Sequence, residues 1–137
     1  MAGSPRVAQK AILIREDGKL LAIRRSKTDP LRPLTWDIPG GEVEYGEDLT
    51  ESIRREVREE AGIDLQDVTL LDIIGFTIPN GEYWVSVGYY AKVSQDTRVT
   101  ISWEHDQYEW ISKEEFLTRE TTDRIRRFLS KAVSPPR

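Results

Sequence analysis

Residues 41–63 read GEVEYGEDLTESIRREVREEAGI, in which a glycine-containing turn leads directly into one strongly patterned helix. Asp48, followed three residues later by Glu51, resembles a capping box at a helix start, and Gly62 is a typical helix stop. We therefore predict a helix over residues 48–61 that packs on a sheet. Its buried face is formed by apolar side chains that recur every fourth residue, namely Leu49, Ile53, Val57 and Ala61.

The same helix carries three acids near its C-terminal end, Glu56, Glu59 and Glu60. At this spacing they share one face, with Cβ atoms roughly 5–6 Å apart. Each like-charged pair costs roughly 0.2–0.5 kcal/mol, and acids at this end also oppose the helix dipole. A solvated face eased by Arg55 is the simpler interpretation. A divalent cation, which binds carboxylates, water and phosphate oxygens together, accounts better for the unfavourable position.

The segment before the glycine turn predicts a β-hairpin. Apolar and polar residues alternate on both sides of an Asp-Gly pair, which gives strands near 6–15 and 19–25. SKTDPLRPLT, residues 26–35, contains two prolines and should form an exposed loop. That loop leads to Gly40 and Gly41, where the backbone can approach a ligand closely and offer a carbonyl oxygen, although a simple tight turn is the other interpretation.

The segment after the helix predicts a second hairpin and two closing helices. Strand-like runs over 67–78 and 82–93 meet at Asn80-Gly81, which suits a type I′ turn. A short strand at 108–112, a helix starting at Ser112 and an amphipathic helix over 122–133 follow. Because strands dominate the first and middle parts and helices interrupt and close the chain, we predict the α+β class.

Composition limits the chemistry. The 137 residues suggest a single domain, and the chain has no cysteine and one histidine, His105, so a metal would be held by oxygen atoms. A formal charge of −4 argues against long nucleic acid as a partner and leaves small anions open. The N-terminal residues contain no run long enough for a signal peptide or a membrane span, so we expect a cytoplasmic protein without membrane contact.

Residues 41–63 resemble the Nudix box, which reads Gly, five residues, Glu, seven residues, then Arg-Glu-apolar-x-Glu-Glu-x-Gly-apolar. The resemblance implies the Nudix fold, a mixed β-sheet sandwiched between α-helices. It also implies one Nudix hydrolase domain over residues 1–137, with short flexible tails at about 1–5 and 133–137. The matching positions are Gly41, Glu47, Arg55, Glu56, Val57, Glu59, Glu60, Gly62 and Ile63.

Nudix enzymes cleave the diphosphate of a nucleoside diphosphate linked to another group, using water and usually Mg²⁺ or Mn²⁺. The resemblance implies that the metal ligands are Glu56, Glu59 and Glu60 together with the carbonyl of Gly40. It further implies that Arg55 orients Glu56 and that Glu47 braces the turn through a salt bridge. A metal-activated water and neutralised phosphate charge are what this hydrolysis requires.

The general base and the substrate contacts are less constrained. Glu104, six residues before Trp110, resembles the loop acid that serves as base in some family members, while Asp106 and Glu109 remain alternatives. We expect His105 to be a surface or packing residue. Arg24, Arg25 and the backbone at Gly41 are our candidates for phosphate contacts. Solubilising side chains are the simpler interpretation of these arginines and of the neighbouring Lys27 and Arg32.

Base stacking could involve four aromatic residues, although core packing explains them as well: Phe76, Tyr83, Trp84 and Tyr89. Pro79 follows Ile63 at the distance typical of ADP-ribose hydrolases, but it also suits the turn, so nucleoside triphosphate and ADP-ribose or nucleotide-sugar substrates both stay open. A Nudix-fold regulatory domain that binds a nucleotide without turnover, and a purely structural module, are the alternatives to an enzyme. Family members are often dimers, which leaves a homodimer open.

Overall fold

The computed structural model describes residues 3–132. The other seven residues, 1, 2 and 133–137, include most of the two predicted tails and lie outside the described part. No helix among the described residues is long and apolar enough to cross a membrane. The elements in chain order are β1 Arg6–Ile14, β2 Leu20–Arg25, β3 Trp36–Asp37, β4 Gly40–Glu42, α1 Leu49–Ala61, β5 Thr69–Thr77, β6 Tyr83–Lys92, β7 His105–Ile111, α2 Lys113–Leu117 and α3 Asp123–Lys131.

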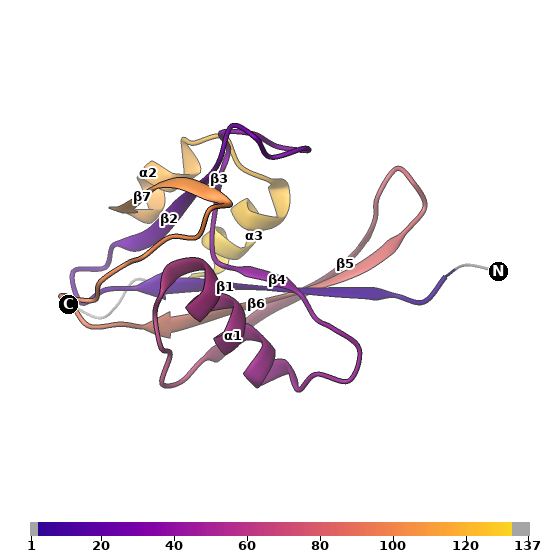
Figure 1. Cartoon of the computed structure of the whole chain (residues 1–137), viewed down its shortest axis with the longest axis horizontal. Helices are drawn as coiled ribbons and strands as arrows, with labels where there is room; N and C mark the ends of the chain where they lie inside the picture. Colours follow the sequence, from indigo (N-terminus) through magenta and orange to yellow (C-terminus); the bar gives the residue numbers. More distant parts are fainter. Residues whose placement is uncertain (1–2, 133–137) are drawn as a thin grey trace.

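One seven-stranded mixed sheet organises the molecule, with β3-β2-β1-β6-β5 as its main path (Figure 1). The long central pair, β1 and β6, is parallel, whereas β5 runs antiparallel to β6. β4 pairs antiparallel with β1, and β7 pairs antiparallel with β2. The glycine turn is therefore fixed to the sheet before α1 begins, because Gly40 and Gly41 are themselves residues of β4.

The sheet separates two hydrophobic cores. Successive side chains of a strand point to opposite faces, so in β1 Leu13 joins the core under α1 while Ile12 joins the core under α2 and α3. Figure 1 shows α1 on one side of the sheet and α2 with α3 on the other. The α+β class and the mixed sheet between helices are thus confirmed.

The predicted caps of α1 are present. The side chain of Asp48 accepts a hydrogen bond from the backbone N–H of Glu51 at 3.1 Å, and Gly62 adopts a left-handed φ of 69° while its N–H donates to the carbonyl of Arg58. The apolar row packs as predicted at Ile53, Val57 and Ala61, which are fully buried, while Leu49 at the first turn is 44% exposed.

The predicted type I′ turn at Asn80-Gly81 is wrong. A type I′ turn needs positive φ at both central residues, but only Gly81, with φ of 91°, has it. The N–H of Gly81 donates to the carbonyl of Ile78, and the N–H of Ile78 donates to the carbonyl of Glu82, which is a three-residue hairpin loop. The side chain of Asn80 accepts from the N–H of Glu82 and so stabilises negative φ at its own position.

Candidate active site

Two of the three clustered acids of α1 face a pocket beside the glycine turn. Glu56 and Glu60 line the pocket together with Gly40 and Gly41. The backbone N–H of Gly40 points at Glu60 Oε2 from 3.4 Å. A Cβ atom at Gly41 would lie 2.7 Å from the carboxyl carbon of Glu56, so only glycine lets the turn approach this carboxylate. The box glycines therefore bring backbone and carboxylates together.

The guanidinium group of Arg55 contacts three glutamates. Its Nε and Nη2 contact both carboxylate oxygens of Glu47 at 3.1 and 3.2 Å. Nη2 also lies 3.2 Å from Glu56, and Nη1 lies 3.2 Å from Glu59. Glu47 in turn accepts the N–H of Glu44, which closes the turn before α1. The guanidinium is thus in contact with the carboxylate that it is expected to orient.

Glu59 differs from its two neighbours because its side chain is exposed, is held by Arg55 and does not line the pocket. Among residues 3–132, no three acidic or histidine side chains stand close enough together to form a ready metal centre. The structure therefore brings together Glu56, Glu60 and the backbone of Gly40, while Glu59 would have to leave Arg55 to join them.

The electrostatics of this pair of carboxylates suit a cation. Burial raises the pKa of Glu60 to about 8, and the charges of Asp37 and Glu56 act in the same direction while Lys10 opposes them. Burial also raises the pKa of Glu56, with Arg55 opposing. Two half-buried carboxylates that repel each other, next to a backbone turn, are a hard oxygen donor set of the kind that Mg²⁺ binds. The residues present therefore fit the metal that the family uses.

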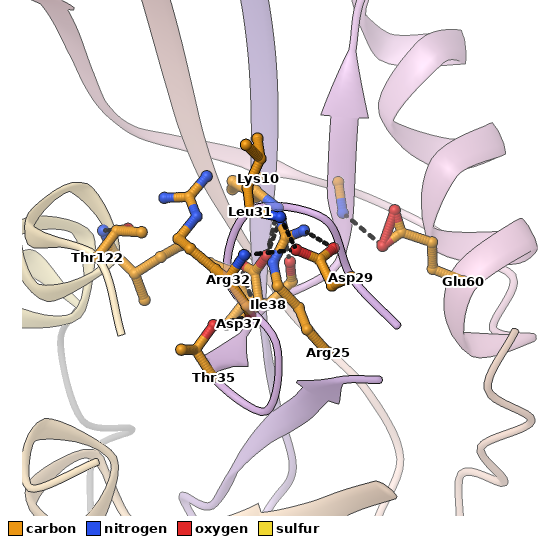
Figure 2. Close-up of polar contacts among 12 residues, drawn as sticks. Lys10, Arg25, Asp29, Leu31, Arg32, Thr35, Asp37, Ile38, Glu60 and Thr122 are labelled. Atoms are coloured by element: carbon orange, nitrogen blue, oxygen red, sulfur yellow. Dashed lines mark hydrogen bonds and ion pairs between the residues drawn. The ribbon is translucent and has the colours of Figure 1, made fainter. Parts of the chain in front are cut away.

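A buried ion cluster lies next to the carboxylates (Figure 2). Lys10 donates to Asp37 at 3.0 Å and to the carbonyl of Ile38 at 3.3 Å. Arg25 contacts Asp37 and Asp29, each at 2.9 Å. Burial alone would raise the pKa of Asp37, but the charges of Lys10 and Arg25 outweigh it and lower the pKa to about 2. The cluster ties β1, β2 and β3 to the loop over residues 26–35.

The pocket itself has a volume of about 1200 Å³, large enough for a nucleotide. One part is acidic and formed by α1 and the glycine turn, and another part is basic. The floor between them includes apolar side chains of β5. The basic and apolar lining residues include Lys10, Arg25, Arg32, Arg124, Arg127, Ile74, Phe76, Ile78 and Trp84.

The two arginines that are candidates for substrate contacts face in different directions in the structure. Arg25 lines the pocket, but Arg24, on the opposite face of β2, does not. Arg24 instead contacts both carboxylate oxygens of Asp106 at 2.9 and 3.0 Å. Asp106, one of the two alternative candidates for the general base, is therefore held in an ion pair. Glu109 is held by Arg119. Glu104 remains exposed and lines the pocket, as expected of a residue that could exchange protons with solvent.

Of the four aromatic residues considered for stacking, Phe76 and Trp84 line the pocket. Tyr89 is buried and donates to Gln9 at 2.6 Å, which is a packing role. Tyr83 is 45% exposed and does not line the pocket.

Sequence reasoning missed four residues of the site. Lys10 and Asp37 read as ordinary strand residues, and Arg124 as one charge of an amphipathic helix. His105 was expected at the surface or in packing, yet it lines the pocket with 9% exposure and a buried Nδ1 that has no hydrogen-bond partner. Only the polar pair Gln9-Lys10 inside the apolar run of β1 hinted at Lys10, since an uncompensated lysine is rarely buried.

The chain is similar to characterised proteins along nearly all of its length. A family model that describes a NUDIX domain matches residues 4–132. Nucleoside triphosphatase NudI of Salmonella arizonae is 34% identical over 113 residues, which cover 76% of this chain and 80% of the relative. RNA pyrophosphohydrolase of Caulobacter vibrioides is 30% identical over 101 residues, which cover 74% of this chain and 52% of the relative.

The solved structures agree with this assignment. A MutT protein from Methanosarcina mazei has a TM-score of 0.81 and 29% identity, with 95% of this chain and 94% of that chain covered. A MutT NUDIX hydrolase from Burkholderia pseudomallei has a TM-score of 0.78 and 28% identity, with 96% and 100% covered. Box, fold and relatives coincide, and the chain belongs to the Nudix family of hydrolases, which act on phosphoanhydrides.

Proposed function

We propose that this protein is a Mg²⁺-dependent pyrophosphohydrolase that cleaves the diphosphate of a small nucleoside diphosphate-X substrate, with Mn²⁺ as the alternative metal. The observation that carries the proposal is the pair Glu56 and Glu60, half-buried and mutually repelling, facing the backbone of Gly40 and Gly41 at one end of a nucleotide-sized pocket. The names of its relatives, a nucleoside triphosphatase and an RNA pyrophosphohydrolase, support a phosphoanhydride substrate.

Each residue has a separate task in this proposal. Glu56, Glu60 and the carbonyl of Gly40 would hold the cation, with Glu59 as a further ligand once it leaves Arg55. The cation, when bound, neutralises the charge of the diphosphate oxygens and lowers the pKa of the attacking water. Arg55 keeps Glu56 oriented through the 3.2 Å contact. Glu104, at the solvent-exposed part of the pocket lining, is the candidate that accepts the proton of the attacking water.

A substrate panel tests the proposal. Purified protein with Mg²⁺ is incubated with NTPs, dNTPs, nucleotide sugars, ADP-ribose and dinucleoside polyphosphates, and release of nucleoside monophosphate is measured. We expect turnover of at least one substrate, and loss of this turnover when EDTA removes the metal. Nucleotide affinity without product in every case would instead favour the regulatory, non-hydrolytic domain.

A further inference from the structure

The basic part of the pocket contains two arginines that have no ionic partner among residues 3–132. Figure 2 shows Arg32 and Thr122 on one side of Lys10 and Asp37, and Glu60 on the other. Arg124 follows Thr122 by two residues, in the first turn of α3. Arg32 and Arg124 both line the pocket that also contains the two carboxylates. The pocket is therefore acidic at one end and basic at the other.

Neither arginine is neutralised by a carboxylate among the residues that the structure describes. Within residues 3–132, the two carboxylates of the buried ion cluster are already engaged, because Asp37 binds Lys10 and Arg25, and Asp29 binds Arg25. Arg32 and Arg124 take part in no ion pair of the described residues. The Nε of Arg124 is buried and has no hydrogen-bond partner in the described part of the chain.

The arrangement is electrostatically unfavourable as it stands. Burial lowers the pKa of Arg124, and the charges of Arg32 and Arg25 lower it further against the opposing effect of Asp37. A guanidinium nevertheless stays charged at any ordinary pH, so it cannot escape the repulsion by losing its proton. An unpaired, partly buried charge costs free energy that an anion in the pocket would remove.

Local contacts position both residues without satisfying their guanidinium groups. The guanidinium carbon of Arg124 lies 5.9 Å from the ring centroid of Phe76, which limits its freedom. The backbone of Arg32 is fixed because its N–H donates to Asp29 at 2.7 Å and its carbonyl accepts from Thr35 at 2.8 Å. A guanidinium group presents a fork of donors that matches the oxygens of a phosphoryl group.

The position of Arg32 and Arg124 in the same pocket as Glu56 and Glu60 indicates which ligand the two arginines bind. Asp37, which binds Lys10 and Arg25, lines the same pocket as Glu60 and Arg124. A diphosphate held by the cation at Glu56 and Glu60 leaves the arginines without an anion. A triphosphate would supply one, because it carries a phosphoryl group beyond the two that a cation at Glu56 and Glu60 would hold.

Resting on the proposed function, we propose that Arg32 and Arg124 bind a third phosphoryl group, so that the pocket selects nucleoside triphosphates over nucleoside diphosphates and nucleotide sugars. The two arginines are specificity-determining residues in this assignment. They come from the 26–35 loop and from α3, outside the Nudix box. Free inorganic phosphate shares the same chemistry, and the experiment separates the two.

The test compares substrates that differ in one phosphoryl group. kcat and KM are measured with Mg²⁺ for a nucleoside triphosphate, the matching diphosphate and the matching nucleotide sugar, using wild type, Arg32→Gln, Arg124→Gln and Arg124→Lys. We expect each Gln variant to lower kcat/KM for the triphosphate about 10- to 100-fold, mainly through KM, and to change the diphosphate less than about threefold. Arg124→Lys should recover only part of the loss because a lysine lacks the fork.

Arg98→Gln is the matched control, since it removes the same charge from an exposed position away from the pocket. It should leave the preference for the triphosphate unchanged. Should Arg124→Gln fail to fold, Arg32→Gln gives the same test, because no hydrogen bond of the described residues involves the Arg32 guanidinium. Equal losses for the triphosphate and the diphosphate, or no loss for either, would overturn the proposal.

Binding separates this proposal from the proposed function. Dissociation constants of a triphosphate and a diphosphate with non-hydrolysable bridges are measured by calorimetry, so a protein without turnover still reports its preference. The same variants are titrated with inorganic phosphate. Phosphate affinity that depends on Arg32 and Arg124, together with an unchanged triphosphate preference, would assign the site to the free ion and overturn the substrate role.

Discussion

Glu60 carries the strongest functional signal of any single side chain in the protein. Its pKa is raised to about 8 because the carboxyl is buried and lies near Asp37 and Glu56, and the fold keeps it there although a glutamine would avoid the cost. A carboxyl group that is kept buried at this cost is expected to take part in binding the cation and the substrate.

Glu60→Gln should lower kcat/KM by about 100-fold or more, because the amide has no charge to hold the cation. Steady-state kinetics on the best substrate of the panel, with circular dichroism to verify the fold, measures this effect. Glu51→Gln is the control, as it makes the same change at an exposed position on the same helix. Comparable activity of Glu60→Gln and Glu51→Gln would contradict the assignment of Glu60 as a ligand.

His105 provides a second test at a single side chain. Burial, helped by the charges of Lys10 and Arg25, lowers the pKa of its imidazole from 6.5 to about 4, so the ring is neutral in the folded protein at pH 7. Between pH 6.5 and 4 the unfolded chain binds more protons than the folded one. The free energy of unfolding should therefore fall as the pH drops from 6.5 to 4. Above pH 6.5, His105 should not change how the free energy of unfolding depends on pH.

Because the chain has one histidine, NMR titration of a single imidazole measures this pKa directly. Urea unfolding at pH 7 and pH 5 gives the matching stability change, and His105→Gln should lose less stability between the two values than wild type. An imidazole that titrates near 6.5 would show that the ring is solvated, contrary to its position in the structure.

The helix α1 positions the carboxylates of the candidate active site. Its N-cap fixes where the helix begins, and the beginning fixes which residues of the last turns face the pocket. A shift of one residue would rotate Glu56 and Glu60 by about 100°, away from Gly40 and Gly41. The cap and the glycine turn are therefore functional as well as structural features.

Asp48→Ala should lower the free energy of unfolding by about 1 kcal/mol, since the N–H of Glu51 loses its acceptor. Chemical denaturation measures the change. Asp48→Ser retains an acceptor and should restore most of the stability, whereas Asp64→Ala, at an exposed site outside the helix, should change it much less. An Asp48→Ala variant as stable as wild type would mean that the cap does not stabilise α1.

The molecule as a whole brings together groups that are far apart in the chain. The pocket receives side chains from β1, β2, α1, β5, the start of β7 and α3, so its shape depends on the complete sandwich. α3 reaches its place because Phe128 packs against Gly88 of β6, where even a Cβ atom would lie 2.7 Å from the ring. A cation that binds only this assembled site must stabilise the entire fold.

Mg²⁺ should therefore raise the melting temperature, and the stabilisation should grow with the logarithm of its concentration above the dissociation constant, to about 2.7 kcal/mol at a hundredfold excess. Calorimetry with and without Mg²⁺ measures the shift. Glu60→Gln should abolish most of it, and Glu51→Gln should retain it. An equal shift in both variants would place the bound cation elsewhere.

Local features of this protein were predictable from the sequence. The limits of α1, its caps and the first hairpin follow from residues within a few positions of one another. The spacing placed Glu56, Glu59 and Glu60 on one face, but only Glu56 and Glu60 line the pocket. The turn at Asn80-Gly81 was mispredicted because the same pair suits two hairpin loops, and the choice depends on the hydrogen bonds of Ile78 with the residues across the loop. The spacing of nearby residues determines where a helix or strand forms, but it does not always determine the conformation of the loop that follows.

The sequence by itself determined the fold class, the family and the carboxylates of the box, because these depend on periodicity and spacing along the chain. Only the tertiary structure decided that Arg25 and not Arg24 faces the pocket, that Glu59 is held by Arg55, and that Lys10 and Asp37 form a buried pair. It also brought Arg32 and Arg124 into one pocket from positions 92 residues apart. The physical reason is that side-chain charges interact through space, and strand pairing and helix docking set those distances.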